Sequence, residues 1–169
     1  MLKVLIPVDG TRNSHHAVQH VIKQCVTNAA MEIHLLNVQP PFSRHIARFA
    51  SKENRDDYHR DQAEKALLAA RQMLADQGLA HTAHIEIGKK AEIIADLARR
   101  LDCDHIVMST ARKNSLTRML EDSVTNKVLE LTSVPVAVIA GDAVSGFERY
   151  GIPAGFGAVV ALLLFAAAD

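Results

Sequence analysis

The stretch Met1-Leu-Lys-Val-Leu-Ile-Pro-Val-Asp-Gly10 (MLKVLIPVDG) decides the fold of this chain. Its short apolar run over residues 2–8 is typical of a strand that is buried on both faces. Asp9 and Gly10 close the run with a turn, and Asn13 or Ser14 can cap the helix that follows. A buried strand, a turn and a helix in this order predict the first unit of an α/β protein.

The same pattern recurs along the chain. Further strands are expected over residues 31–38, 82–87, 105–108 and 134–140. Helices are expected between them, including 58–77 and about 123–132, while residues 39–57 form a long polar connection. Strands alternating with helices predict an α/β fold: a five-stranded parallel sheet in the flavodoxin-like order 3-2-1-4-5, with helices on both faces. Ligands bind where such an order reverses, so a site is expected at the loops after Val8, Val38 and Met108.

Composition and charge exclude several classes of protein. The 169 residues are enough for one domain with a full hydrophobic core. Nineteen Lys and Arg residues balance nineteen Asp and Glu residues, so no nucleic acid partner is expected. Cys25 and Cys103 are isolated and fit neither a disulfide framework nor a metal motif. The first apolar run is too short for a signal peptide, which predicts a cytoplasmic location.

The histidines predict no metal site, and no motif predicts a catalytic residue. His16 and His20 are spaced i, i+4, but they lie opposite the apolar stripe of their helix and are expected to face solvent. His81 and His84 are an odd number of residues apart, so they point to opposite faces of a strand. The chain contains no P-loop or nucleophile-elbow pattern. We therefore expect a binding protein and not an enzyme.

Several short motifs, taken together, resemble the universal stress protein family. They are VLIPVDG at 4–10, Leu-Leu-Asn-Val ending at Val38, Gly88 followed by Ile93-Ile94-Ala95 and Ala98, the run from Asp104 to Met108, and VPVAVI from Val134. Their order and spacing match the family over about residues 2–140. The resemblance implies the adenine nucleotide alpha hydrolase-like form of the fold.

The glycine motif of that family is missing here. Its ATP-binding members carry Gly-x2-Gly-x9-Gly and then Ser or Thr after the fourth strand, because a loop that wraps phosphates leaves no room for side chains. The matching positions in this chain are Ser109, Arg112, Asp122 and Ser123, so all three glycines are absent. Asp122 also places negative charge where phosphates would approach. The chain thus resembles the family branch that lacks the motif, and no cofactor is expected.

By resemblance, a vestigial nucleotide pocket would use Pro7, Asp9, Val38, Met108, Ser109, Arg112, Ser123 and Val124. The residues themselves leave an alternative open. Val38 and Met108 also fit core packing at strand ends, and Asp9 also fits a turn residue that bonds its own backbone. A second alternative is ATP binding, in which Arg112 and Ser123 grip a phosphate.

Two segments are candidate contact surfaces. The strand that begins at Val134 and ends at Ala140 would lie at the sheet edge, where partners are recruited. In the resembling family this strand often pairs with its twin, which implies a homodimer. The resemblance ends near Gly141, dividing the chain into a domain over 1–141 and a hydrophobic tail over 142–169. The tail's uncharged run, which begins at Gly151 and ends at Ala168, approaches the length of about 20 residues that spans a membrane.

These features predict a dimeric regulatory protein of the stress response, with a degraded nucleotide pocket, that acts through contact with an unknown protein partner. Two alternatives remain. One is an ATP or AMP sensor, or a slow ATPase, with the same fold. The other is an accessory protein that its tail recruits to a membrane. The competing interpretation is that the tail packs on protein.

Overall fold

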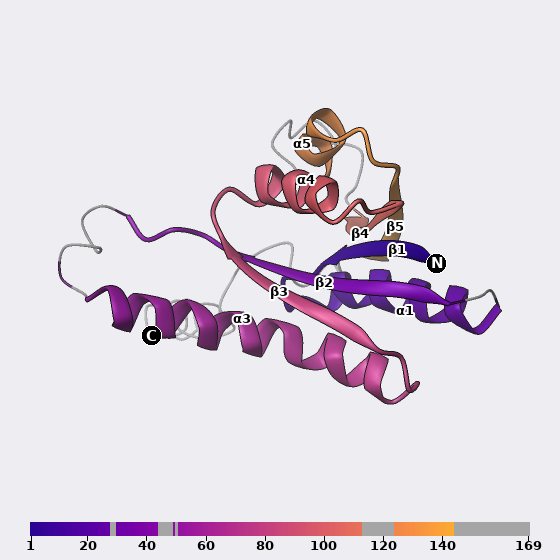
Figure 1. Cartoon of the computed structure of the whole chain (residues 1–169), viewed down its shortest axis with the longest axis horizontal. Helices are drawn as coiled ribbons and strands as arrows, with labels where there is room; N and C mark the ends of the chain where they lie inside the picture. Colours follow the sequence, from indigo (N-terminus) through magenta and orange to yellow (C-terminus); the bar gives the residue numbers. More distant parts are fainter. Residues whose placement is uncertain (28–29, 44–48, 50, 113–123, 144–169) are drawn as a thin grey trace, which may run out of the picture.

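The computed structural model of the chain describes residues 1–27, 30–43, 49, 51–112 and 124–143. Its centre is one parallel sheet, built from β1 (Leu2–Pro7), β2 (Met31–Gln39), β3 (His81–Ile87), β4 (His105–Arg112) and β5 (Val136–Ala143). The strands lie in the order β3-β2-β1-β4-β5, which confirms the predicted order (Figure 1). The order in which strands are added to the sheet therefore reverses between β1 and β4, and a ligand site at a switch point requires such a reversal.

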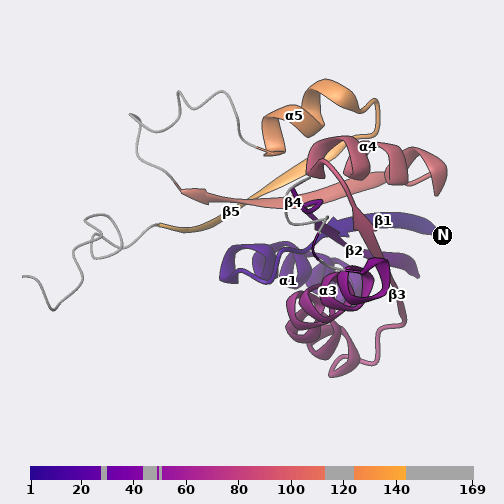
Figure 2. The same cartoon turned by 90° about the vertical axis from the view of Figure 1, so that its left-hand side faces the viewer.

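In the part of the chain that the structure describes, two helices cover each face of the sheet. The helices α1 (Arg12–Thr27) and α3 (Lys52–Ala75) pack on one face, and α4 (Lys90–Arg100) and α5 (Val124–Leu131) pack on the other (Figure 2). Alternate side chains of β1 enter the two layers: Val4 and Ile6 face α1 and α3, whereas Leu5 faces α4 and α5. Burial on both faces explains why β1 is an unbroken apolar run from Val4 onward and does not alternate.

The connection after β2 is shorter than the sequence predicts, because α3 begins at Lys52 and not at residue 58. Ser51 caps this helix: its hydroxyl accepts a hydrogen bond from the Asn54 N–H at 3.1 Å. The first turns of α3 are charged and carry no apolar stripe, so periodicity did not reveal them. Farther along, the predicted stripe packs on the sheet through Ala63, Leu67, Ala70 and Leu74.

The fourth strand extends past the predicted end at Met108. Polar residues continue it to Arg112, and each is held by pairing with β5: Ser109 with Ile139, Thr110 with Ala140 and, after a bulge, Arg112 with Ala143. The predicted strand stopped early because its apolar signal stops at Met108. Pairing to a neighbouring strand, which the local sequence does not display, supplies the rest.

The fifth strand is displaced by two residues from the predicted start, and it runs on to Ala143, beyond the boundary expected at Gly141. The rest of the predicted tail, residues 144–169, lies outside the described residues, and so does its apolar run. Among the helices that the structure describes, none combines the length and apolar character needed to cross a membrane.

The histidines of α1 differ from the prediction. His16 and His20 are half-buried and do not stand free in solvent, because α1 packs against α3 as well as against the sheet. Within the described ranges, no group of three or more His, Cys, Asp or Glu side chains is arranged to hold a metal ion.

Candidate functional site

A cavity of about 360 Å³ opens at the carboxyl ends of β1 and β4, at the switch point of the sheet. Its volume lies in the range of ~300–1,000 Å³ that is usual for small-molecule sites. Residues from all the surrounding elements line it: Pro7, Val8, Asp9, Thr11, Asn13, Ser14, Leu36, Val38, Lys90, Ile94, Met108, Ser109, Thr110, Val124 and Thr125. The predicted residues Pro7, Asp9, Val38, Met108, Ser109 and Val124 are therefore brought together.

The turn after β1 forms the polar rim of the cavity. Gly10 adopts a left-handed φ of 79°, which glycine reaches without strain. The Asp9 carboxylate accepts hydrogen bonds from the Thr11 N–H at 3.0 Å and the Thr11 hydroxyl at 2.6 Å. The Ser14 hydroxyl in turn donates to the Thr11 carbonyl at 2.8 Å. Asp9 is thus a turn residue that also lines the cavity, and its assignment to a nucleotide pocket stays a prediction.

The charge of Asp9 is stabilised by this turn. Partial burial raises the pKa of the Asp9 carboxyl, but hydrogen bonds from the Thr11 side chain and backbone, from Ser14, and the nearby Lys90 ammonium together bring the pKa below its usual value. The rim therefore presents a carboxylate at neutral pH.

One wall of the cavity comes from β2. Leu36 and Val38 present apolar side chains, and both are also buried members of the core on the α4 side. Asn37, the buried residue between them, holds this wall in place, because its side-chain amide donates to the Val8 carbonyl at 2.7 Å. This bond ties the ends of β1 and β2 together at the mouth of the cavity.

The opposite wall comes from the end of β4. Met108 is apolar and almost fully buried, so it too serves both the core and the cavity. The Ser109 hydroxyl donates a short hydrogen bond to the Asn13 carbonyl at the start of α1. Gly141 of β5 lies against the Asn13 side chain, so closely that a Cβ there would collide with it. This wall is therefore a packed junction of β4, β5 and α1.

Nine lining residues were not among the predicted site residues: Val8, Thr11, Asn13, Ser14, Leu36, Lys90, Ile94, Thr110 and Thr125. Leu36 and Thr110 lie on strands and Val8 directly follows β1, whereas the other six lie in the turn after β1 or on the helices that follow the strands. Asn13 and Ser14 were recognised only as helix caps. A rule that collects the first turns of helices following parallel strands would have found most of these six.

Two predicted residues are not placed in the cavity. The backbone of Arg112 ends β4, and its side chain lies outside what the structure describes. Ser123, like Asp122, also lies outside the described residues. The grip of Arg112 and Ser123 on a phosphate therefore stays a prediction.

The arrangement combines two apolar walls with a rim that carries one carboxylate, one ammonium and several hydroxyl groups. Apolar walls with a few fixed polar groups are typical of sites that hold a small ligand and orient it.

Comparison with known proteins points to one family. A family model described as the universal stress protein family matches residues 1–140. A curated universal stress protein of Methanocaldococcus jannaschii is 30% identical over 145 residues, which covers 81% of this chain and 81% of that protein.

Two solved structures are similar in fold. The structure of a protein named MJ0577 has a TM-score of 0.67 and 28% identity, and the match covers 82% of this chain and 95% of that one. A universal stress protein family protein from Arabidopsis thaliana with AMP bound has a TM-score of 0.60 and 18% identity, over 89% of this chain and 97% of that one.

Proposed function

The chain belongs to the universal stress protein family, and from this premise we propose that it is a regulatory binding module. In this proposal it acts in the cytoplasm through contacts with other proteins, and its pocket does not hold the triphosphate of ATP.

The observation that carries the proposal is the length of β4. A phosphate-binding loop must leave the sheet so that its backbone N–H groups can turn toward the phosphates. Here the chain stays paired with β5 through Thr110 and Arg112, over the positions where the first two glycines of the ATP motif would stand. The backbone groups of β4 that pair with β5 are not available to a phosphate.

The side chain of Ser109 supports the same conclusion. Its hydroxyl is engaged with the Asn13 carbonyl and closes the gap between β4 and α1. A glycine at this position would leave that space open. Asp122 in the sequence further disfavours a group that carries several negative charges.

A second candidate function is binding of a nucleotide with one phosphate. The cavity is open, and its lining includes Pro7, Asp9, Val38 and Met108, the residues that the family resemblance assigns to the adenine side. AMP is bound to the Arabidopsis thaliana protein of similar fold. Lys90, which approaches Asp9 from α4, would contribute one positive charge to such a ligand.

A titration with Mg-ATP and with AMP separates these possibilities, and an assay of released phosphate tests the slow ATPase alternative. The proposal expects no saturable ATP binding and no turnover above buffer. Binding of AMP alone would favour the second candidate.

The protein contacts begin, we propose, with a homodimer through β5. In the described part of the chain β5 is an edge strand that pairs only with β4, and Val138 on it is 43% exposed. An apolar edge strand whose outer side pairs with no other described strand is a surface through which a second copy can extend a sheet.

Replacing Val138 with lysine is expected to convert the dimer to a monomer, because a charged side chain on an edge strand opposes pairing. Sedimentation velocity over a range of concentrations measures the change. Leu68→Lys is the control: Leu68 is also exposed and apolar, but it lies on α3, away from this edge. A Val138→Lys variant that stays as dimeric as the control would contradict the β5 interface.

A further inference from the structure

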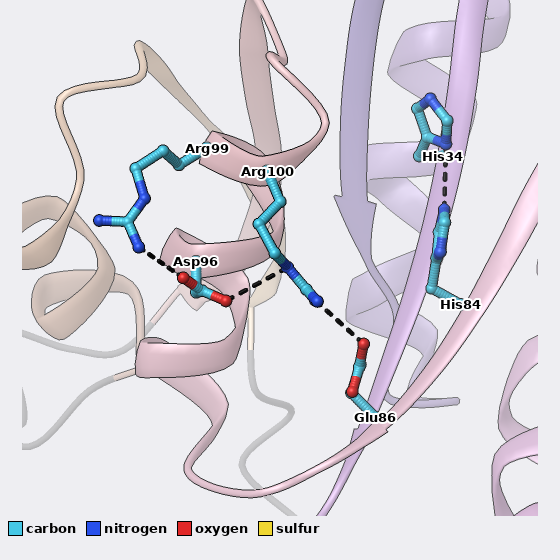
Figure 3. Close-up of polar contacts among 6 residues, drawn as sticks. All are labelled: His34, His84, Glu86, Asp96, Arg99 and Arg100. Atoms are coloured by element: carbon cyan, nitrogen blue, oxygen red, sulfur yellow. Dashed lines mark hydrogen bonds and ion pairs between the residues drawn. The ribbon is translucent and has the colours of Figure 1, made fainter.

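Two histidines on neighbouring strands form a pair that does not line the cavity. His34 of β2 and His84 of β3 face each other, with 3.0 Å between His34 Nδ1 and His84 Nε2 (Figure 3). Their rings lie 5.2 Å apart between centroids. His34 is almost fully buried, and His84 is half-buried. Because the nitrogens are at hydrogen-bond distance, one of them must donate a hydrogen and the other must accept it.

The neighbouring Glu32 carboxylate determines which nitrogen of His34 carries a hydrogen. The Glu32 carboxylate lies 3.1 Å from His34 Nε2 and can only accept, so this nitrogen carries a hydrogen. When His34 is neutral, its Nδ1 accepts from His84 Nε2. When His34 is protonated, its Nδ1 donates and His84 accepts. Both states keep the bond, but a state with both rings protonated has two donors facing each other and loses it.

The charged groups around the pair come from β2, β3 and α4. On β2, Glu32 contacts His34 and can balance one positive charge. On β3, Glu86 is already paired with Arg100 of α4 at 3.1 Å. On α4, Asp96 is also engaged, by Arg100 and by Arg99 (Figure 3).

His84 is the ring that resists protonation. Burial lowers the pKa of His84 most, and the neighbouring His34 lowers it further; Glu86 opposes the shift, and Arg100 adds to it. The folded-state pKa of His84 thus lies below its ordinary value of 6.5. The unfolded chain binds this proton more readily, so stability is intact above about pH 6.5 and is lost as pH falls through the folded-state pKa.

The position of the pair determines what this loss affects. The strand β3 is the other edge of the sheet, and among the described residues it pairs only with β2. His34 lies opposite Thr82 and His84 opposite Leu36, so the pair joins the two strands diagonally across the middle of their contact. A break there weakens one edge of the sheet and leaves β1 and β4 untouched.

We propose that the His34–His84 pair is an acid-sensitive latch that stabilises the attachment of edge strand β3 at neutral pH and weakens it when both rings are protonated. The weakened edge opens more often, so backbone groups of β2 and β3 are exposed more often than at neutral pH.

Native-state hydrogen exchange of the full chain between pH 7.5 and about pH 5 tests the latch. Protection factors are compared, since they correct for the pH dependence of the exchange chemistry itself. The protection of β3 amides is expected to fall roughly three- to tenfold in acid, the effect of one lost hydrogen bond, while β1 and β4 amides change little.

His84→Gln is the decisive variant. The amide of glutamine can either donate to or accept from His34, and it does not titrate, so the acid response of β3 is expected to vanish. His81→Gln is the matched control: His81 lies on the same strand but bonds the Leu79 carbonyl instead, and this variant should keep the response. The latch is overturned if β3 protection in the wild type does not depend on pH, or if His84→Gln responds as the wild type does.

A second readout keeps the test sound if His84→Gln does not fold. In the wild type, the ¹⁵N chemical shifts of the imidazoles report each ring's protonation separately. One ring is expected to titrate below pH 6.5, and its titration should coincide with the loss of β3 protection. Independent protonation of both rings near pH 6.5 would contradict the proposal.

Discussion

Replacing Leu5 with alanine is expected to destabilise the fold by about 2–5 kcal/mol, the range for emptying a fully buried leucine site. Leu5 is 0% exposed and lies on β1, the strand that pairs with both β2 and β4. It packs in the layer under α4 and α5 together with Leu36, which lines the cavity. The loss is large because the closely packed central strand cannot move to fill the void that the shorter side chain leaves.

Denaturant titration measures this loss as a lower midpoint with an unchanged slope. Leu68→Ala makes the same chemical change on α3, where the side chain is 67% exposed, and is expected to cost less than about 0.5 kcal/mol. Equal losses at the two positions would show that β1 is not the buried centre of the sheet.

Replacing Gly10 with alanine is expected to cost about 2–3 kcal/mol. Gly10 has a φ of 79°, and a Cβ there would lie 3.0 Å from the Ala66 Cα of α3. The variant therefore combines backbone strain with a clash against helix backbone. The substitution also displaces the turn that holds Asp9 and Thr11 at the cavity rim.

Gly78 offers a matched control for the clash. It has a similar φ of 65°, but a Cβ there meets no atom within 4 Å. Gly78→Ala is therefore expected to cost only the strain, about 1 kcal/mol. Thermal and denaturant unfolding of the two variants compare the costs, and a Gly78→Ala variant as unstable as Gly10→Ala would refute the contact with α3.

The fold was predictable from the sequence because its signals are local. Most strand cores are apolar runs, β3 alternates polar and apolar residues, and the order 3-2-1-4-5 fits the alternation of strands and helices. The predicted start of α3 and the predicted end of β4 were wrong, because contacts outside the local apolar pattern stabilise both. The charged start of α3 depends on the Ser51 cap, and the polar end of β4 depends on pairing with β5.

The candidate site was predictable at the strand ends but not on the helices. Asp9, Val38 and Met108 follow directly from the switch-point rule. Lys90 and Ile94 reach the cavity from the first turns of α4, and that placement depends on how the β3–α4 turn orients the helix. The His34–His84 pair was missed because it depends on the register of β2 and β3, which no single stretch of sequence encodes.

The measurement that tests the account most directly is a calorimetric titration of the purified chain with Mg-ATP, with AMP titrated in parallel. We expect no saturable heat with millimolar Mg-ATP, because β4 remains in the sheet where a phosphate loop would be needed. Saturable binding of ATP at micromolar concentration, tighter than that of AMP, would contradict the account and would make Arg112 and Ser123 the first residues to replace.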